Sequence, residues 1–239
     1  MSLFEPSFYG NDRSYRKVDG VMVAIVTNNK DPENLGRVKL KLPLRESENE
    51  TDWTRIATLM AGSDRGSYFV PEVGDEVLVA FHLGEIRQPY VIGMLWSSTQ
   101  PAPKANEDNN LRKIRSRAGH EITFDDDTSA GKIIINTAKG QIIQCDDQAE
   151  TIKIADANGT NSIQIQGGSS GQITVKSQSS TLTLNAKGEI TISGTNSVSI
   201  KALEVAVEAS AALKLKGSAS LNIESDGIVN IKGSLVKFN

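Results

Sequence analysis

Residues 121–239 repeat one short pattern, in which two apolar residues flank a single central residue and a few small or polar residues follow. Because successive side chains of a strand point to opposite faces, the two apolar residues of each repeat lie on the same face. The pattern therefore predicts a series of short, half-buried strands, whose spacing settles close to eight residues from Leu182 onward. The repeats are Ile122-Thr123-Phe124, Ile133-Ile134-Ile135, Ile152-Lys153-Ile154, Ile163-Gln164-Ile165, Ile173-Thr174-Val175, Leu182-Thr183-Leu184, Ile190-Thr191-Ile192, Val198-Ser199-Ile200, Leu213-Lys214-Leu215, Leu221-Asn222-Ile223, Val229-Asn230-Ile231 and Val236-Lys237-Phe238.

Strands this short have almost no core of their own, so their apolar faces must be buried by stacking many copies around one axis. A single-chain β-solenoid and an intertwined trimer both achieve this. A solenoid coil needs roughly 18 or more residues, and no longer period of that size is present. The sequence thus favours a homotrimeric triple-stranded β-prism. Its expected trimer core is Ile173, Val175, Leu182, Leu184, Ile190, Ile192, Val198, Ile200, Leu213, Leu215, Leu221, Ile223, Val229 and Ile231.

The segment from Lys201 to Leu215 offers an alternative, because its Ala, Leu, Glu and Lys residues favour helix. Its apolar residues nevertheless alternate with period two, as in Leu203, Val205 and Val207. We therefore expect strands here, with alanines filling a narrow interior.

The N-terminal part has a different composition. All seven prolines lie at or before Pro103, both tryptophans and all four tyrosines precede residue 97, and no aromatic residue lies between Phe124 and Phe238. Five strand candidates separated by glycine turns and polar loops suggest an oligonucleotide/oligosaccharide-binding (OB) barrel. These candidates are 21–27, 36–42, 53–59, 76–82 and 90–95. We predict an all-β chain with an N-terminal extension (1–17), an OB-fold domain (18–96), a linker or neck (97–120) and a β-helical needle (121–239).

Several motifs in this N-terminal part carry a family resemblance. They are Asp31 with Leu35-Gly36-Arg37-Val38, then Trp53-Thr54-Arg55-Ile56-Ala57, residues 66–79 (GSYFVPEVGDEVLV) and 87–93 (RQPYVIG), followed by residues 115–126 (RSRAGHEITFDD). In order and spacing they resemble the OB domain and needle entrance of the spike proteins of contractile injection systems. That family includes VgrG of type VI secretion, baseplate assembly protein V of contractile phages and the spike of extracellular injection particles.

The resemblance implies a homotrimer at the tip of an inner tube, which pierces the target envelope when the sheath contracts and nucleates baseplate assembly. Only some twenty residues precede the barrel, so a separate hub or baseplate protein is the expected partner at the OB end. A His-x-His iron-binding tip is absent from the repeats. The last residues, Val236, Lys237, Phe238 and Asn239, resemble a blunt end that a PAAR-type tip protein caps, and effector cargo is a further possible partner.

Candidate chemistry is sparse. The carboxylates of Asp125-Asp126-Asp127 suit calcium but also suit a solvated turn, and the pair His120-Glu121 lacks the third group of an acid/base constellation. The glycine-rich stretch 167–171 lacks the lysine and helix of a phosphate loop. The single cysteine, Cys145, has no partner for an internal disulfide. We predict no enzyme, no catalytic residue, no cofactor and no metal.

Net charge and hydropathy restrict the partners further. A net charge of −3 without a basic cluster argues against nucleic acid as a partner. Because no signal peptide and no membrane-spanning run is present, contact with a membrane is expected only during piercing. We expect synthesis in the cytoplasm and incorporation at the tip of a phage tail-like particle. The alternative is a trimeric β-helical adhesin or polysaccharide-depolymerase rod. The lack of aromatic platforms argues against the depolymerase, and the lack of Gly-Gly-x-Gly-x-Asp repeats argues against a calcium-dependent adhesin.

Overall fold

The computed structural model describes residues 17–43 and 50–237 of the 239-residue chain. Those residues are almost wholly β, and their one helical element is a single 3-10 turn, η1 (His82–Gly84). The predicted all-β class is confirmed. The chain forms two compact units, Met1–Thr151 and Ile152–Asn239. The predicted domain boundaries stay a prediction.

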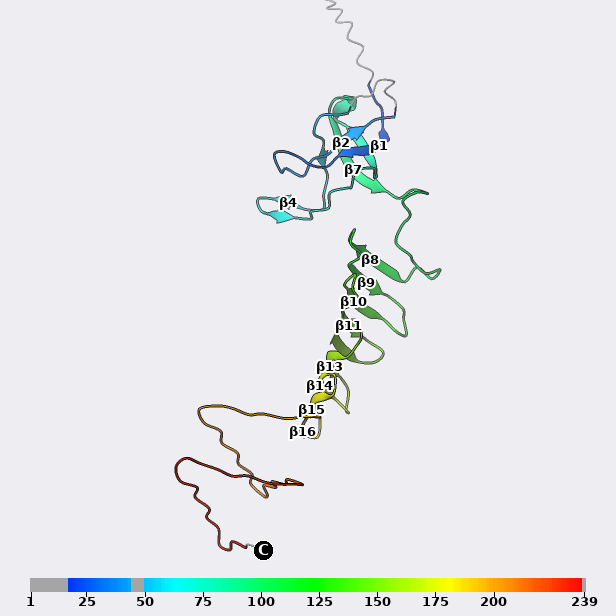
Figure 1. Cartoon of the computed structure of the whole chain (residues 1–239). Coiled ribbons are helices and arrows are strands. Elements are labelled where there is room, and N and C mark those ends of the chain that lie inside the picture. The colour runs from blue at the N-terminus through cyan, green and yellow to red at the C-terminus, as the bar shows by residue number, and fades with distance from the viewer. Residues whose placement is uncertain (1–16, 44–49, 238–239) are drawn as a thin grey trace, which may run out of the picture. The chain divides into compact units, whose positions relative to one another are not determined.

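The first unit begins with a small barrel built on a five-stranded sheet of order β2-β1-β6-β7-β3. Strand β6 (Glu76–Phe81) lies between β1 (Val21–Asn28) and β7 (Pro89–Leu95) and is antiparallel to both. Strand β2 (Lys39–Lys41) pairs with β1, and β3 (Arg55–Ile56) runs parallel to β7. Figure 1 shows β1, β2 and β7 of this sheet close together.

The barrel core follows from the alternation of residues along these strands. Every second residue of β1 and β6 points inward, and the register pairs Ala24 with Val77. The fully buried set is Ala24, Val26, Val38, Leu40, Leu42, Val77, Val79 and Val91. Three of the five predicted strands match within about a residue, whereas 36–42 and 53–59 yield only β2 and β3. Val38 and Thr54, in the remainder of these two segments, form an isolated antiparallel bridge.

A hairpin of two short strands, β4 (Ala61–Gly62) and β5 (Arg65–Gly66), forms where the sequence predicted only glycine turns. Each strand has two residues. It forms a separate two-stranded sheet, and Figure 1 shows it standing away from the barrel strands.

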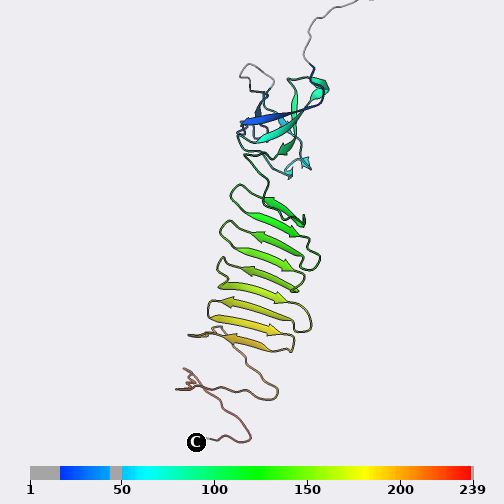
Figure 2. The same cartoon turned by 90° about the vertical axis from the view of Figure 1, so that its right-hand side faces the viewer.

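The same unit continues with antiparallel strands β8 (Leu111–Arg115), β9 (Glu121–Asp125), β10 (Lys132–Asn136) and β11 (Ile142–Asp146). Each pairs with the next, and the arrows in Figure 2 alternate in direction. The repeat pattern predicted β9 and β10 but missed two strands. Strand β8 lies in the segment expected to be a neck, and the apolar residues of β11 do not follow the repeat.

The second unit contains β12 (Thr151–Ala155), which begins at the unit boundary, then β13 (Asn161–Gln166), β14 (Gln172–Ser177), β15 (Ser180–Asn185) and β16 (Ile190–Ser193). Strands β13 to β16 pair antiparallel in chain order. All five correspond to predicted repeats.

Residues 194–237 form neither the predicted strands nor the alternative helix. A strand requires a hydrogen-bonding neighbour, and the single chain supplies none in this segment. Pairing with other copies therefore stays a prediction. In the described ranges, no helix has the length and apolar character needed to span a membrane.

Candidate functional site

The apolar residues of β8 to β11 form two columns on one face of the sheet. Residues opposed in an antiparallel pair share a face. One column joins Phe124, Ile133 and Cys145, and the other joins Ile122, Ile135 and Ile143, each residue lying opposite the next in the adjacent strand. Ile114 of β8 extends the second column by pairing with Ile122.

The second unit repeats this arrangement. The first column there runs through Ile163, Val175, Leu182 and Ile192, and the second through Ile165, Ile173, Leu184 and Ile190. The structure therefore brings six predicted trimer-core residues of β14 to β16 onto one face. Their contact with other copies is untested.

An isolated sheet in water would cover its apolar face and expose its polar face, but in this chain the apolar face is the more exposed one. The column side chains of β9 to β14 other than Cys145 are 37–47% exposed, and those of β16 are 60–68% exposed. On the opposite face, Thr123 is buried at 6%. An apolar face of this length is unfavourable in water, and large exposed apolar patches mark interaction surfaces.

The opposite face of β8 to β11 carries ion pairs formed within one chain, beside the apolar Ile134, which pairs with Thr123 and Gln144. Glu121 pairs with Arg115 at 3.0 Å and with Lys113 at 3.4 Å, and Lys132 pairs with Asp146 at 3.0 Å. The hydroxyl of Thr123 donates to Glu121 and, together with these cations, lowers the pKa of the Glu121 carboxyl. This face is thus suited to face water.

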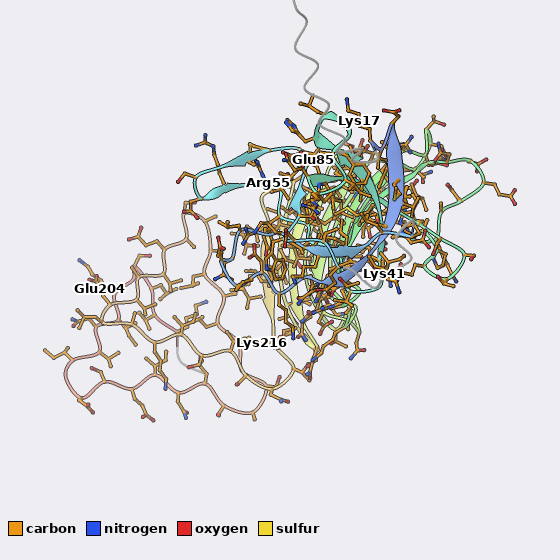
Figure 3. All side chains as sticks on the ribbon, turned by 90° about the horizontal axis from the view of Figure 1, so that it is seen from above. Lys17, Lys41, Arg55, Glu85, Glu204 and Lys216 are labelled. Atoms are coloured by element: carbon orange, nitrogen blue, oxygen red, sulfur yellow. The ribbon has the colours of Figure 1, made fainter. Side chains whose placement is uncertain are left out.

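Residues 195–237 are exposed throughout, and within that range no backbone–backbone hydrogen bond forms. Figure 3 shows Glu204 and Lys216 on an open trace without strand arrows. The predicted core residues in this segment all face solvent in the single chain, namely Val198, Ile200, Leu213, Leu215, Leu221, Ile223, Val229 and Ile231. Of the predicted cap residues, Val236 and Lys237 are exposed, and Phe238 and Asn239 lie outside the described residues.

The candidate chemical motifs have structural roles. Asp127 accepts hydrogen bonds from the Ser129 hydroxyl and from the backbone N–H groups of Ser129 and Ala130, which lowers the pKa of its carboxyl. Asp126 pairs with Arg112 at 3.2 Å. The three aspartates thus hold a turn. Over residues 17–43 and 50–237, no group of three or more His, Cys, Asp or Glu side chains is placed to hold a metal ion.

The pair His120-Glu121 does not form an acid/base arrangement. Nδ1 of His120 accepts a hydrogen bond from the backbone N–H of Ala138 at 3.2 Å, whereas Glu121 is held by the cations described above. The glycine-rich stretch forms a turn between β13 and β14, closed by the N–H of Gly171 donating to the carbonyl of Gly168.

A groove of about 660 Å³ lies beside the β4–β5 hairpin and was not predicted from the sequence. Leu35, Ile56, Met60, Tyr68 and Phe69 supply its apolar lining. Tyr68 is 80% exposed and Phe69 is 63% exposed, and this adjacent aromatic pair is the sequence signal that could have indicated the groove.

Comparison with known proteins identifies the family of the barrel and finds relatives of about half of the chain. Residues 22–96 match the family model of the type VI secretion system/phage-baseplate injector OB domain. The chain is 32% identical over 137 residues to the type VI secretion system spike protein VgrG3 of Vibrio cholerae, covering 52% of this chain and 14% of that protein. It is 30% identical over 144 residues to the spike protein VgrG1b of Pseudomonas aeruginosa, covering 53% of this chain and 19% of the relative.

A third relative, the spike protein VgrG2a of Pseudomonas aeruginosa, is 30% identical over 127 residues, covering 47% of this chain and 15% of that protein. The match to these relatives thus spans less than a fifth of their length. The recognition made from the sequence is confirmed, because the chain is VgrG-like and carries the injector OB domain of type VI secretion systems and phage baseplates.

Proposed function

We propose that this protein is the trimeric spike at the tip of the inner tube of a contractile injection system. In this role it pierces the target envelope on sheath contraction and nucleates baseplate assembly. The observation that carries the proposal is the pair of apolar columns left open to water in each unit of a chain with a spike-family OB domain.

Three copies with their apolar faces turned inward would remove these columns from water. Burial of apolar surface contributes about 25 cal/mol per Å², so the gain is large over a face of this length. The ion-paired polar faces would then point outward, where charges remain solvated. A closed prism would also leave no exposed sheet edge.

The segment 195–237 supports the same arrangement. Its backbone N–H and C=O groups need partners when they are buried, and its alternating apolar residues need cover. No proline lies after Pro103, so every backbone donor in this segment is available for pairing between chains. The function is mechanical, and the proposal requires no catalytic group or cofactor.

The proposed partners follow from this role. A separate hub or baseplate protein binds at the OB end, and a PAAR-type tip protein binds at Val236 to Asn239, with effector cargo as a further passenger. The protein is made in the cytoplasm, is incorporated at the tip of a virion or extracellular particle, and meets a membrane only while piercing it. It binds no nucleic acid.

The test is the mass of the purified protein by light scattering, with and without boiling in detergent. A mass near three times the chain's 25.7 kDa, lost only on boiling, is the expected result. A monomer in native buffer would overturn the proposal, because one chain cannot cover its own apolar face.

A further inference from the structure

The turn between β12 and β13 contains Asn158-Gly159, and no other asparagine of the chain is followed by glycine. Both residues are exposed. Because glycine has no Cβ, the side chain of the preceding residue can approach its backbone nitrogen closely. A Cβ added at Gly159 would meet no atom within 4 Å beyond its chain neighbours, so the space around this position is open.

The side chain of Asn158 is also free to turn. Within the described ranges it makes no hydrogen bond, unlike that of Asn161 at the start of β13. The Nδ2 of Asn161 donates to the Asp156 carboxylate at 2.6 Å, and its Oδ1 accepts a hydrogen bond from the Ser177 hydroxyl at 2.8 Å. The structure thus distinguishes a free amide from a held one within a few residues.

The backbone of the turn restrains the nitrogen of Gly159. Its N–H donates to the carbonyl of Asp156 at 3.1 Å, as in a closed β-turn. The carboxylate of Asp156 in turn accepts hydrogen bonds from the hydroxyl and the N–H of Thr160. An amide nitrogen attacks a neighbouring carbonyl carbon only after it has lost its proton, so the turn must open before Gly159 can react.

We propose that Asn158 is a site of spontaneous deamidation, whose rate is set by opening of the turn that Asp156 holds. The Gly159 nitrogen, after losing its proton to base, forms a bond to Cγ of Asn158. The bond from Cγ to Nδ2 then breaks, and Nδ2 leaves as ammonia after taking a proton from water. One water molecule opens the resulting succinimide ring, so that one water is consumed, one ammonia is released and no atom changes its oxidation state.

Ring opening gives two products, because water can attack either carbonyl carbon of the succinimide. One product is aspartate, and the other is isoaspartate, in which the backbone runs through Cβ and Cγ and is longer by one methylene. Each product places a new carboxylate two residues from Asp156, where like charges repel. Deamidation should therefore weaken the turn. The reaction involves one chain and water alone, so it does not rest on the proposed trimer.

Peptide mapping of the full chain by mass spectrometry tests the site. The chain is kept folded in mildly alkaline buffer, samples are digested with trypsin at intervals, and the first sample corrects for conversion during digestion. Residues 154–176 form one tryptic peptide that contains both Asn158 and Asn161, so fragmentation compares the two in the same molecules. Two product peptides of equal mass are expected, both with OH in place of NH2 at Asn158.

Asn158→Gln is the matched control, because its longer side chain would have to close a six-membered ring and should stay unconverted. Conversion at Asn158 that is no faster than at Asn161 would overturn the site. So would the absence of conversion in the folded chain over a period in which the chain in denaturant converts.

Thr160→Val tests the control by the turn. This variant lacks the hydroxyl that donates to Asp156, so conversion at Asn158 relative to Asn161 should accelerate roughly two- to tenfold, the change in population that one lost hydrogen bond produces. Thr183→Val makes the same substitution on β15, outside this turn, and should leave the rate unchanged. An unchanged rate in Thr160→Val, or equal acceleration in both variants, would show that opening of this turn does not limit the reaction.

Discussion

Arg37 donates two parallel hydrogen bonds to the Asp31 carboxylate, from Nε to Oδ2 at 2.9 Å and from Nη2 to Oδ1 at 2.8 Å. The Asp31 side chain is only 3% exposed and also accepts hydrogen bonds from the backbone N–H groups of Glu33, Leu35 and Arg37. The Arg37 side chain, followed by these amides, holds the pKa of Asp31 well below its usual range. One carboxylate thus fixes the loop between β1 and β2.

Replacing Arg37 should therefore destabilise the OB domain. Arg37→Lys keeps the charge but loses the planar fork that matches a carboxylate, so the melting temperature should fall, and it should fall further with Arg37→Gln. Thermal unfolding followed by tryptophan fluorescence measures the effect. Lys39→Gln is the control, because it removes a more exposed pair with Glu50 and should change the melting temperature little. Equal shifts for both sites would contradict the role of Arg37.

Leu40 tests the barrel core. Its side chain, on β2, is fully buried in the barrel core, so Leu40→Ala should lower the free energy of unfolding by about 2–5 kcal/mol. Denaturant titration measures this loss. Leu83→Ala, at an exposed position in η1, should stay within about 0.5 kcal/mol of the parent chain. A smaller loss at Leu40 than at Leu83 would show that the core is misassigned.

The sequence predicted the strands whose apolar residues are two apart, because that spacing alone places both on one face. It missed β8, in which Leu111 and Ile114 are three apart, and β11, in which Ile142 and Ile143 are adjacent and point to opposite faces. Pairing with regular neighbours, such as Ile135 with Ile143, creates these two strands. Tertiary context decides such segments, and a local pattern does not contain it.

The candidate site also has a part that the sequence predicted and a part that it did not. The columns through Ile173 and Val175 follow from the repeat, since register brings equivalent positions together. The exposed hairpin at Leu59 and the loop fixed by Asp31 depend on long-range geometry and on particular hydrogen bonds, which no periodicity encodes. Segment 195–237 forms no strand in the single chain, although its apolar residues alternate as they do in β14 to β16.

Gly66 tests the hairpin. Its φ of +149° is a conformation that L side chains rarely adopt, and a Cβ there would press against the backbone oxygen of Met60. Gly66→Ala should break the hydrogen bond from Ser67 to Met60 and speed amide exchange over residues 59–68, measured by mass spectrometry. Gly62→Ala is the matched control, because its Cβ would meet only the flexible Arg65 side chain. Equal exchange in both variants would contradict this constraint.

Ile192 and the adjacent Thr191 lie on opposite faces of the sheet in the second unit, so substitutions at these two positions compare the faces. Ile192 continues the apolar column opposite Leu182, whereas Thr191 lies on the other face opposite Thr183. In the proposed trimer, Ile192→Asp would bury three unpaired carboxylates, each at a cost of several kcal/mol, and the soluble trimer should be lost. Thr191→Asp should leave the mass by light scattering unchanged. A trimer of unchanged melting temperature in the Ile192→Asp variant would refute the inward orientation of this face.

Asp156 makes the stability of the second unit sensitive to acid. Its carboxylate accepts hydrogen bonds from the Thr160 hydroxyl at 2.8 Å, the Asn161 amide at 2.6 Å and the Thr160 N–H at 2.9 Å. These bonds, led by the Thr160 hydroxyl, lower its pKa from 3.8 to about 2. Because the folded pKa lies below the unfolded one, the stabilisation is complete above pH 3.8 and is lost as pH falls through about 2.

The melting temperature of the parent chain should therefore exceed that of Asp156→Asn by a constant amount between pH 5 and 7, and the difference should shrink below pH 3.8. Thr160→Val keeps the carboxylate but removes the main cause of its lowered pKa, so this variant should lose stability at a higher pH than the parent chain does. Melting curves from pH 2 to 7 at fixed ionic strength compare the three chains. A difference between parent and Asp156→Asn that stays constant down to pH 2 would mean that this carboxylate stabilises the turn through its shape and not through its charge.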